Sequence, residues 1–584
     1  MRTYPFRKEH LLLFTITSLP IASQAEEKQR PNIIVILTDD MGYSDLGCYG
    51  GVIKTPSLDK LANNGLRFTQ FYNTGRSCPT RASLLTGLHP HQAGIGRMIS
   101  PMGQIGYQGE LNDNCATMGQ VLSNAGYETF AIGKWHVANM ESISEENNKN
   151  GTIDKSDYPL QRGFDHYYGP IVSGNYFDPP FLMRDNEFIS PANDPEYTPK
   201  KGEAYYTTNA FGENAIKYLK ERDKQKPFFM YLAFVAAHWP LQAIEEDVKP
   251  YYGRFDKGWE SIREEVLANM KKEGLVEPSR QLTHDKSIQD WDKVQNKEFE
   301  TRCMEVYAAM VSCMDKNVGR VVNYLEESGE LDNTLILYLQ DNGGCAELAG
   351  KHKVDNPMVE DPKGRAYAPV SKEFVQLEKR PYQTREGKPV RYGYGVMPGG
   401  GDTHLGYGRV WANVSNTPLR EYKHFIHEGG ISTPLIVHWS KGIKAKGELR
   451  TQPGQLMDIM ATIVDVSGAE YPKTINGHKI LPCEGKSLVR SFDTAEPIYP
   501  ERELFWEHEG NRGVRIGDWK AVYKHKRGMP YDADISKWEL YDISKDRNEQ
   551  HNMAKSKPEI LERLYNAWQN YAVRCRVKPW PQKD

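Results

Sequence analysis

The chain has 584 residues, of which 39% are hydrophobic and 26% are charged, so it is long enough to bury a large core and has an ordinary globular composition. Its 74 basic and 77 acidic side chains leave a formal net charge of -3. This balance excludes a chain-wide basic surface for nucleic acid or another polyanion, but it leaves room for a local basic pocket.

The first residues have the order of charged, apolar and small side chains that is typical of an export signal. Three basic residues within the first eight positions precede an apolar run over 11–22, and small residues follow over 22–25. This pattern predicts a signal peptide over residues 1–25 and a mature chain that begins at Glu26. The run is too short for a comfortable membrane span, and no later stretch approaches the ~20 apolar residues that a spanning helix needs. We therefore expect an exported protein without a membrane span.

Apolar runs in the first 440 residues predict five buried strands. The runs are 33–37, 130–132, 228–234, 335–339 and 435–437. Helical patterns with caps lie between them, as at 57–62 and 117–124. Strands that alternate with helices predict an α/β fold with a large, mostly parallel sheet sandwiched by helices.

The character of the sequence changes at the Pro- and Gly-containing segment 471–485, where we expect a second, smaller domain to begin. Short strand patterns that predict a small antiparallel sheet lie at 503–506, 512–516, 519–523 and 538–542. A helical pattern over 558–575 closes the chain. We thus predict a large domain over 26–470 and a C-terminal α+β subdomain over 471–584.

Strongly polar residues follow four of the five runs, where each strand ends. They are T-D-D at 38–40, G-K-W-H at 133–136, A-H-W-P at 237–240 and Q-D-N-G-G at 340–344. Ligands of open parallel sheets bind beyond the carboxyl ends of the strands, so these residues are candidates for one site. Acidic and amide oxygens from two strand ends suit Ca²⁺ or Mg²⁺. Taken singly, Asp-Asp after a strand is often just a helix cap or a turn and Asp-Asn-Gly-Gly is a good turn sequence, so neither pattern alone favours a metal site.

The segment 75–87, G-R-S-C-P-T-R-A-S-L-L-T-G, carries a family resemblance. It resembles the signature of type I sulfatases of the alkaline phosphatase superfamily. In that signature a Cys or Ser, any residue, Pro, a small hydroxyl residue and Arg are followed by three residues and Leu-Thr-Gly. The resemblance extends from Pro31 to about Pro434 and weakly into the C-terminal region. It implies the sulfatase fold and an arylsulfatase-like sulfuric ester hydrolase.

The signature also implies which residue becomes the nucleophile. In the family the Cys or Ser two positions before the Pro is oxidised to formylglycine, and counting back from Pro79 identifies Ser77. Cys78 occupies the variable position, and a shift by one residue would break the spacing to Arg81 and to the Leu-Thr-Gly at 85–87. A serine implies maturation by an anaerobic radical oxidase, hence a bacterium, and the periplasm if it is Gram-negative. Without oxidation, Ser77 would merely cap the following helix.

By resemblance, one cation site contains Asp39, Asp40, Asp341 and Asn342 together with the modified Ser77. The expected ion is a single Ca²⁺ rather than Mg²⁺. Beside a hydrated aldehyde, such an ion would stabilise an oxyanion that attacks sulfur in line and would screen the charge of the sulfate.

The resemblance also implies roles for five further side chains. Arg81 and Lys134 would hold the geminal diol, and Lys423 would reach the sulfate, since fixed positive groups suit charge that spreads over sulfate oxygens. His238 would protonate the leaving alcohol, and His136 would take a proton from the second diol hydroxyl. A His with a pKa near neutrality suits either task.

Two other functions compete with this interpretation. A phosphatase, phosphonate hydrolase or phosphodiesterase could use the same scaffold, although such relatives generally use two metal ions or an unmodified Thr or Ser. A catalytically idle protein that binds sulfated glycans would result if Ser77 were never oxidised.

For the substrate we expect a sulfated sugar at the end of a glycan chain, with aryl sulfates as incidental substrates. Segments 175–180 and 399–411 carry aromatic, carboxylate and backbone groups that suit a sugar, and 341–417 as a whole predicts long loops. Asp402 and His404 are candidates for substrate contact.

Overall fold

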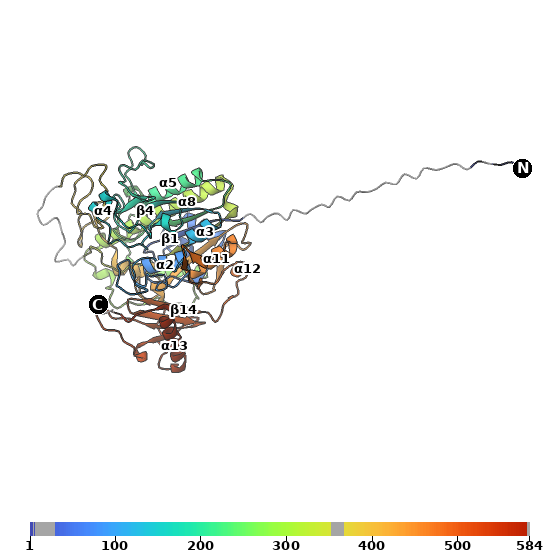
Figure 1. Cartoon of the computed structure of the whole chain (residues 1–584). Coiled ribbons are helices and arrows are strands. Elements are labelled where there is room, and N and C mark those ends of the chain that lie inside the picture. Colours follow the sequence, from blue (N-terminus) through green and yellow to red (C-terminus); the bar gives the residue numbers. More distant parts are fainter. Residues whose placement is uncertain (4, 6–29, 352–366, 581–584) are drawn as a thin grey trace.

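The computed structural model describes residues 1–3, 5, 30–351 and 367–580 (Figure 1). The predicted signal peptide and its cleavage site before Glu26 lie almost entirely outside these residues, so both stay predictions. Among the residues described, no helix is long and apolar enough to cross a membrane.

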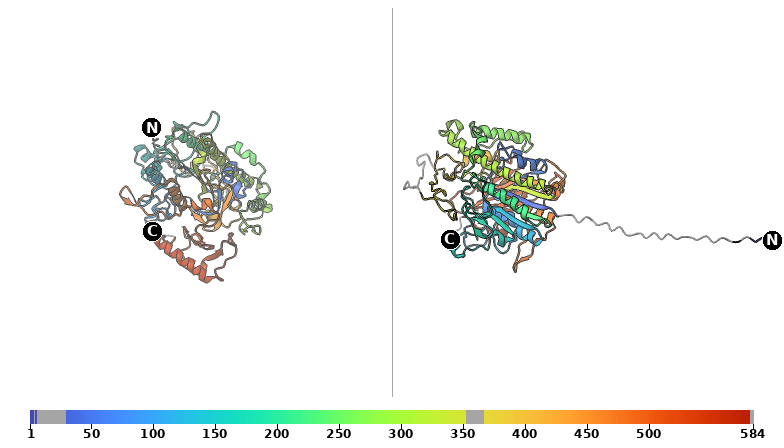
Figure 2. Two further views of the ribbon diagram at one scale, coloured as in Figure 1. Left: turned by 90° about the vertical axis from the view of Figure 1, so that its right-hand side faces the viewer. Right: turned by 90° about the horizontal axis from the view of Figure 1, so that it is seen from above.

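A large mixed sheet forms the centre of the molecule, and Figure 2 shows it from two further sides. Within the described part of the chain it contains 11 strands in the order β10-β2-β9-β8-β1-β7-β3-β4-β5-β6, with β11 paired to β2. The strands are β1 (Asn32–Thr38), β2 (Leu66–Tyr72), β3 (Glu128–Gly133), β4 (His166–Pro170), β5 (Leu182–Arg184), β6 (Glu187–Phe188), β7 (Phe228–Ala233), β8 (Thr334–Gln340), β9 (Ser432–His438), β10 (Glu448–Arg450) and β11 (Gly454–Gln455). β1 is parallel to both of its neighbours, β7 and β8. β9 is antiparallel to both β2 and β8.

Helices cover both faces of this sheet because its central strands are apolar on both sides. In β1, Ile34 and Ile36 pack in the core that contains α5 and α8, whereas Ile33, Val35 and Leu37 pack in the core that contains α2 and α11. The longer helices are α1 (Pro56–Asn63), α2 (Ser77–Thr86), α3 (Met118–Asn124), α5 (Thr207–Glu221), α7 (Gly258–Lys272), α8 (Lys297–Glu327), α9 (Gly408–Ser415), α11 (Met457–Ser467) and α13 (Pro558–Cys575). Short helices are α4 (Glu145–Asn150), α6 (Glu245–Val248), α10 (Glu428–Ile431) and α12 (Arg490–Asp493). The predicted α/β fold class is confirmed.

A smaller antiparallel sheet lies on one side of the large one (Figure 1). Its strands are β14 (Glu503–His508), β15 (Asn511–Ile516), β16 (Trp519–Tyr523) and β17 (Glu539–Asp542), paired in that order. A hairpin of β12 (Thr474–Ile475) and β13 (His478–Lys479) precedes it. α13 buries Leu564 and Trp568 against the small sheet. The domain boundary near 471 stays a prediction.

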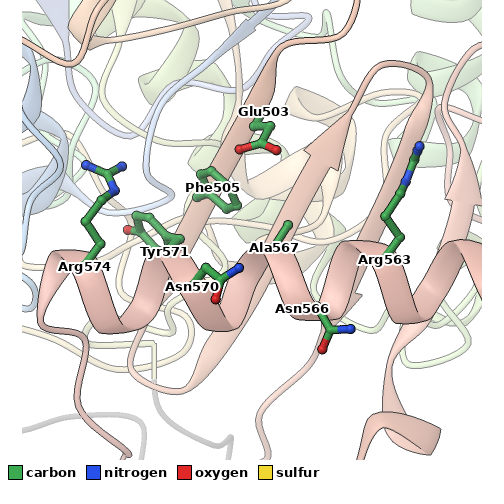
Figure 3. A pocket seen from close by; sticks show the side chains of 8 residues that line it. All are labelled: Glu503, Phe505, Arg563, Asn566, Ala567, Asn570, Tyr571 and Arg574. Atoms are coloured by element: carbon green, nitrogen blue, oxygen red, sulfur yellow. The ribbon is translucent and has the colours of Figure 1, made fainter.

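Figure 3 shows a surface pocket between α13 and β14. Phe505 of β14 and Tyr571 of α13 stack with ring centroids 4.7 Å apart, and Arg563 and Arg574 line the pocket on either side. None of the predicted site residues lines this pocket.

A buried charged cluster joins the small sheet to the large one. The carboxylate of Glu428 accepts from Lys520 at 2.8 Å through Oε1 and from Arg547 at 2.9 Å through Oε2. The Tyr72 hydroxyl of β2 donates to Oε2 at 3.1 Å. Lys520 also pairs with Glu549 at 2.9 Å. Because the side chains of Glu428, Lys520 and Glu549 are 0% exposed, water cannot replace these contacts.

Candidate active site

The ten predicted site residues lie in one buried group at the carboxyl ends of the central strands. Asp39 and Asp40 follow β1, Lys134 and His136 follow β3, His238 follows β7, Asp341 and Asn342 follow β8, Ser77 and Arg81 belong to α2, and Lys423 precedes α10. None of the ten is more than 8% exposed. Because β1 has parallel neighbours on both sides, its polar end is placed between two other strand ends.

Ser77 lies at the start of α2, where Arg81 reaches it from the next turn on the same helix face. Its Oγ accepts from Arg81 Nε at 2.9 Å and lies 3.3 Å from His136 Nδ1. The same guanidinium donates to the Lys134 carbonyl at 2.8 Å and to Asp341 Oδ2 at 3.0 Å. Arg81 therefore ties the Ser77 hydroxyl to two strand ends.

Two buried oxygens of the site, one of Asp39 and one of Asn342, lack a hydrogen-bond donor. Lys134 Nζ donates to Asp39 Oδ2 at 2.5 Å, and Asn342 Nδ2 donates to Asp40 Oδ1 at 2.8 Å. Asp39 Oδ1 and Asn342 Oδ1 are buried without a hydrogen-bond partner. Burial and the neighbouring Asp341 raise the pKa of Asp39 to about 7, against the opposing charge of Lys134. Buried oxygens left without donors fit a hard cation such as Ca²⁺.

Asp40 pairs with Lys423, whereas Asp39 pairs with Lys134. Lys423 Nζ lies 2.7 Å from Asp40 Oδ1 and 2.9 Å from Oδ2. Burial raises the pKa of Asp40, but Lys423 and His238 outweigh burial and keep the pKa well below its usual range. Asp40 and His136 both have φ of 59°, which non-glycine residues rarely adopt. Such conformations cluster at functional sites.

The two histidines differ in their partners. Burial, followed by the charges of Lys134 and other cations, lowers the pKa of His136 well below its usual value, so its imidazole is neutral in the structure. His238 Nδ1 lies 2.5 Å from the Trp239 carbonyl oxygen, which assigns the proton to Nδ1 in the neutral ring. His238 Nε2 lies 3.5 Å from Asp40 Oδ2. Burial lowers the pKa of His238 to about 3, against the opposing charge of Asp40.

Sequence reasoning missed Glu347, which lies beside Lys423. Its carboxylate pairs with Arg76 at 2.7 Å, accepts from Trp239 Nε1 at 3.2 Å and lies 3.7 Å from Lys423 Nζ. Glu347 follows β8 in a segment without periodicity, so no local pattern marks it. Glu347 therefore links Lys423 to Arg76, the residue that precedes Ser77.

Two residues named as candidates for substrate contact lie in different surroundings. The His404 ring packs against the Trp239 ring at 5.3 Å between centroids, and Trp239 directly follows His238. Asp402 instead pairs with Arg391 at 2.7 Å. His404 is therefore next to the site, whereas Asp402 is engaged within its own loop.

Comparisons with known proteins identify the family of this chain. The profile of the sulfatase family matches residues 31–469, and that of the "N-sulphoglucosamine sulphohydrolase, C-terminal" family matches residues 421–571. The chain is 33% identical to an uncharacterized sulfatase of Schizosaccharomyces pombe, over 96% of each chain. It is 29% identical to an arylsulfatase of Klebsiella aerogenes, over 80% of this chain and 93% of the relative.

Two further proteins are similar over most of their length. An N-acetylglucosamine-6-O-sulfatase of Bacteroides thetaiotaomicron is 27% identical, over 96% of this chain and 91% of the relative. A solved structure of a protein in complex with its substrate D-glucosamine-2-N,6-O-disulfate has the same fold, with a TM-score of 0.59 and 22% identity over 95% of this chain and 100% of the other. A family profile that covers most of the chain, together with the S. pombe relative, identifies this protein as a member of the sulfatase family and an enzyme that hydrolyses sulfate esters.

Proposed function

We propose that this sulfatase releases inorganic sulfate from sulfated sugars of glycans, with a formylglycine made from Ser77 and one bound Ca²⁺. The observation that carries the proposal is the contact of Ser77 Oγ with Arg81 and His136, beside a cluster of buried acidic oxygens. The match of the chain to an N-acetylglucosamine-6-O-sulfatase supports a sugar substrate.

The cation would be held by Asp39, Asp40, Asp341 and Asn342 together with the modified Ser77. The unpartnered oxygens of Asp39 and Asn342 support this set. When bound, Ca²⁺ supplies positive charge that screens the sulfate and stabilises an oxyanion at residue 77. We favour Ca²⁺ over Mg²⁺ because Mg²⁺ prefers a near-ideal octahedron in which it keeps several waters.

Oxidation of Ser77 supplies an aldehyde, whose hydrate is a geminal diol and a stronger nucleophile than the serine hydroxyl. Arg81 Nε, at 2.9 Å from Ser77 Oγ, orients the oxygen of residue 77. His136, whose Nδ1 lies 3.3 Å from Ser77 Oγ, would take a proton from the second diol hydroxyl after the sulfate has been transferred; the aldehyde then re-forms as the bond to the sulfate oxygen breaks and inorganic sulfate leaves. Lys134, which pairs with Asp39, would hold the diol together with Arg81, and Lys423, which pairs with Asp40, would reach the sulfate oxygens.

His238 would donate a proton to the leaving alcohol. Its Nδ1 is engaged by the Trp239 carbonyl, so Nε2 is the atom available for this transfer. His238 is neutral without substrate, because burial lowers its pKa to about 3. We infer that the negative charge of a bound sulfate ester raises the pKa of His238 and recruits the proton. On this side of the site the Arg380 guanidinium lies over the Trp239 ring, 5.8 Å from its centroid, and we expect a sugar to contact this aromatic and cationic pair.

The substrate class is tested by sulfate release from 3-, 4- and 6-sulfated galactose, N-acetylglucosamine and N-acetylgalactosamine, with nitrophenyl sulfate and nitrophenyl phosphate alongside. The enzyme should be matured in a host whose oxidase accepts serine. We expect at least one sulfated sugar to have a higher kcat/KM than nitrophenyl sulfate. A higher kcat/KM for nitrophenyl sulfate than for every sugar would contradict the glycan proposal. Faster turnover of the phosphate would contradict the sulfatase proposal itself.

A further inference from the structure

A second group of potential metal ligands lies outside the catalytic cluster, where the small sheet meets the Lys423 segment. It contains His424, His508 and Glu509, and one ligand atom from each lies within 4.8 Å of the others. His508 ends β14 and Glu509 forms the turn to β15, whereas His424 directly follows Lys423. The group therefore joins two regions that are far apart in the sequence.

His508 is the unusual member of this group. Its side chain is 0% exposed, and neither ring nitrogen has a hydrogen-bond partner. A buried polar group without a partner costs about 1–3 kcal/mol, so an imidazole with two such nitrogens requires an explanation. The rings of His508 and His424 are nearly perpendicular, at 85°, with centroids 5.1 Å apart. Burial lowers the pKa of both histidines, which favours the neutral form that binds metal.

The carboxylate of Glu509 is oriented by a partner on one side only. Oε1 accepts from Arg97 Nε at 2.7 Å, whereas Oε2 lies 3.7 Å from His424 Nδ1. Oε2 is thus available as a single ligand atom, and Arg97 supports it as outer-shell groups support metal-binding carboxylates. Arg76 also lies near this group, but its charge is paired with Glu347 at 2.7 Å. Arg76 is thus compensated by Glu347, Arg97 is paired with Glu509 itself, and Arg527 is a third positive charge near His424.

We propose that His424, His508 and Glu509 bind a transition-metal ion of the zinc class. Two imidazoles and one carboxylate are a ligand set that Zn²⁺ uses, with a fourth position left to water. Ligand atoms of a tetrahedral zinc lie about 3.4 Å apart, given bonds of about 2.0–2.2 Å. His424 Nδ1 and Glu509 Oε2 are already 3.7 Å apart, and the ligand atoms of all three side chains lie within 4.8 Å of one another, so the closure required is at most about 1.4 Å. His424 and Glu509, with side chains 30% and 21% exposed, can move and can admit the ion from solvent.

A metal ion here would clamp the small sheet onto the active-site loops. The His424 amide donates to the Gly75 carbonyl at 2.7 Å, and Gly75 lies two residues before Ser77. Lys423, which precedes His424, contacts Asp40. Binding would restrain both segments through contacts that already exist. This site is separate from the proposed calcium ligands and does not depend on the sulfatase mechanism.

The test is titration of chelator-treated enzyme with Co²⁺ in saturating Ca²⁺, followed by visible absorption, with Zn²⁺ as the competitor. We expect one equivalent of Co²⁺ with the strong bands of four-coordinate nitrogen and oxygen ligation, displaced by Zn²⁺. His508→Ala and Glu509→Gln should each weaken binding by more than about tenfold. His438→Ala is the matched control, because His438 is also buried with an unpartnered ring nitrogen but lies in β9. It should bind Co²⁺ like the wild type.

Two results would overturn the proposal: wild-type enzyme that shows no such bands, or bands of equal strength in Glu509→Gln. Glu509→Gln decides the question if His508→Ala fails to fold, because the partly exposed Glu509 side chain lies on a turn. Elemental analysis of the same samples gives the stoichiometry independently of the spectrum and of activity.

Discussion

Replacement of Glu428 by Gln should destabilise the protein strongly, because the buried cluster between the two sheets loses the negative charge that Lys520 and Arg547 share. Each oxygen of Glu428 accepts from a different cation, Oε1 from Lys520 and Oε2 from Arg547. The amide of a Gln therefore faces a donor in either orientation. The substitution also leaves one positive charge of the cluster uncompensated among side chains that are at most 11% exposed.

Breaking a buried ion pair by removing one partner costs about 3–5 kcal/mol. The matched control is Glu326→Gln on α8, whose carboxylate pairs with Lys60 at 2.8 Å with side chains 51% and 55% exposed. An exposed pair of this kind contributes about 0–1 kcal/mol. The expected difference between the two variants is therefore about 2–5 kcal/mol in the free energy of unfolding.

The loss of stability caused by Glu428→Gln should become smaller as the pH falls. Burial raises the pKa of Glu428, but Lys520 and Arg547 outweigh burial and lower the pKa from 4.5 to about 2. The stabilisation by the carboxylate is thus complete above about pH 4.5, the unfolded pKa, and is lost as the pH falls through about 2. Urea unfolding followed by tryptophan fluorescence at pH 7 and pH 3 measures the difference from wild type. A Glu428→Gln loss no larger than that of Glu326→Gln, or one that grows on acidification, would refute this reasoning.

Further predictions concern the active site and the N-terminus. Ser77→Ala should lower turnover by at least ~10³-fold, whereas Cys78→Ala should keep most of it, and the opposite pattern would show that the signature register is wrong. His238→Ala should lower kcat/KM by about 10²–10⁴-fold for sulfated sugars but far less for nitrophenyl sulfate, whose leaving group needs no proton; equal losses would exclude the general-acid role. A calcium chelator should abolish sulfate release and added Ca²⁺ should restore it, so activity that survives complete chelation would argue against the calcium proposal. N-terminal sequencing of the exported protein should begin at Glu26, and a retained Met1 would reject the predicted cleavage.

Much of the fold could be predicted because the central strands are buried on both faces. The five predicted runs coincide with parts of β1, β3, β7, β8 and β9, and only the run 228–234 extends beyond its strand, by one residue. The four short C-terminal patterns correspond to β14–β17. β2 was missed because polar residues interrupt its apolar pattern, and one of them, Arg67, is buried by pairing with Glu273. α9 formed within a segment that was predicted as loop, where Trp411 anchors it in the core.

The parts of the site that follow strand ends could be found from the chain, because a parallel sheet brings such ends together. Lys423 came from the family resemblance alone, since no strand end or spacing marks it. Glu347, His508 and Glu509 could not be predicted in the same way. Glu347 follows no periodic pattern, and His508 and Glu509 reach the Lys423 segment only because the small sheet packs against it.

If residue 77 acts as a formylglycine, peptide mass spectrometry of active enzyme from a serine-competent host must detect the conversion. We expect the peptide containing residues 75–87 to have lost two hydrogen atoms at Ser77, and the converted fraction to rise in proportion to specific sulfate release. Fully active enzyme with an unmodified Ser77 would exclude a formylglycine nucleophile.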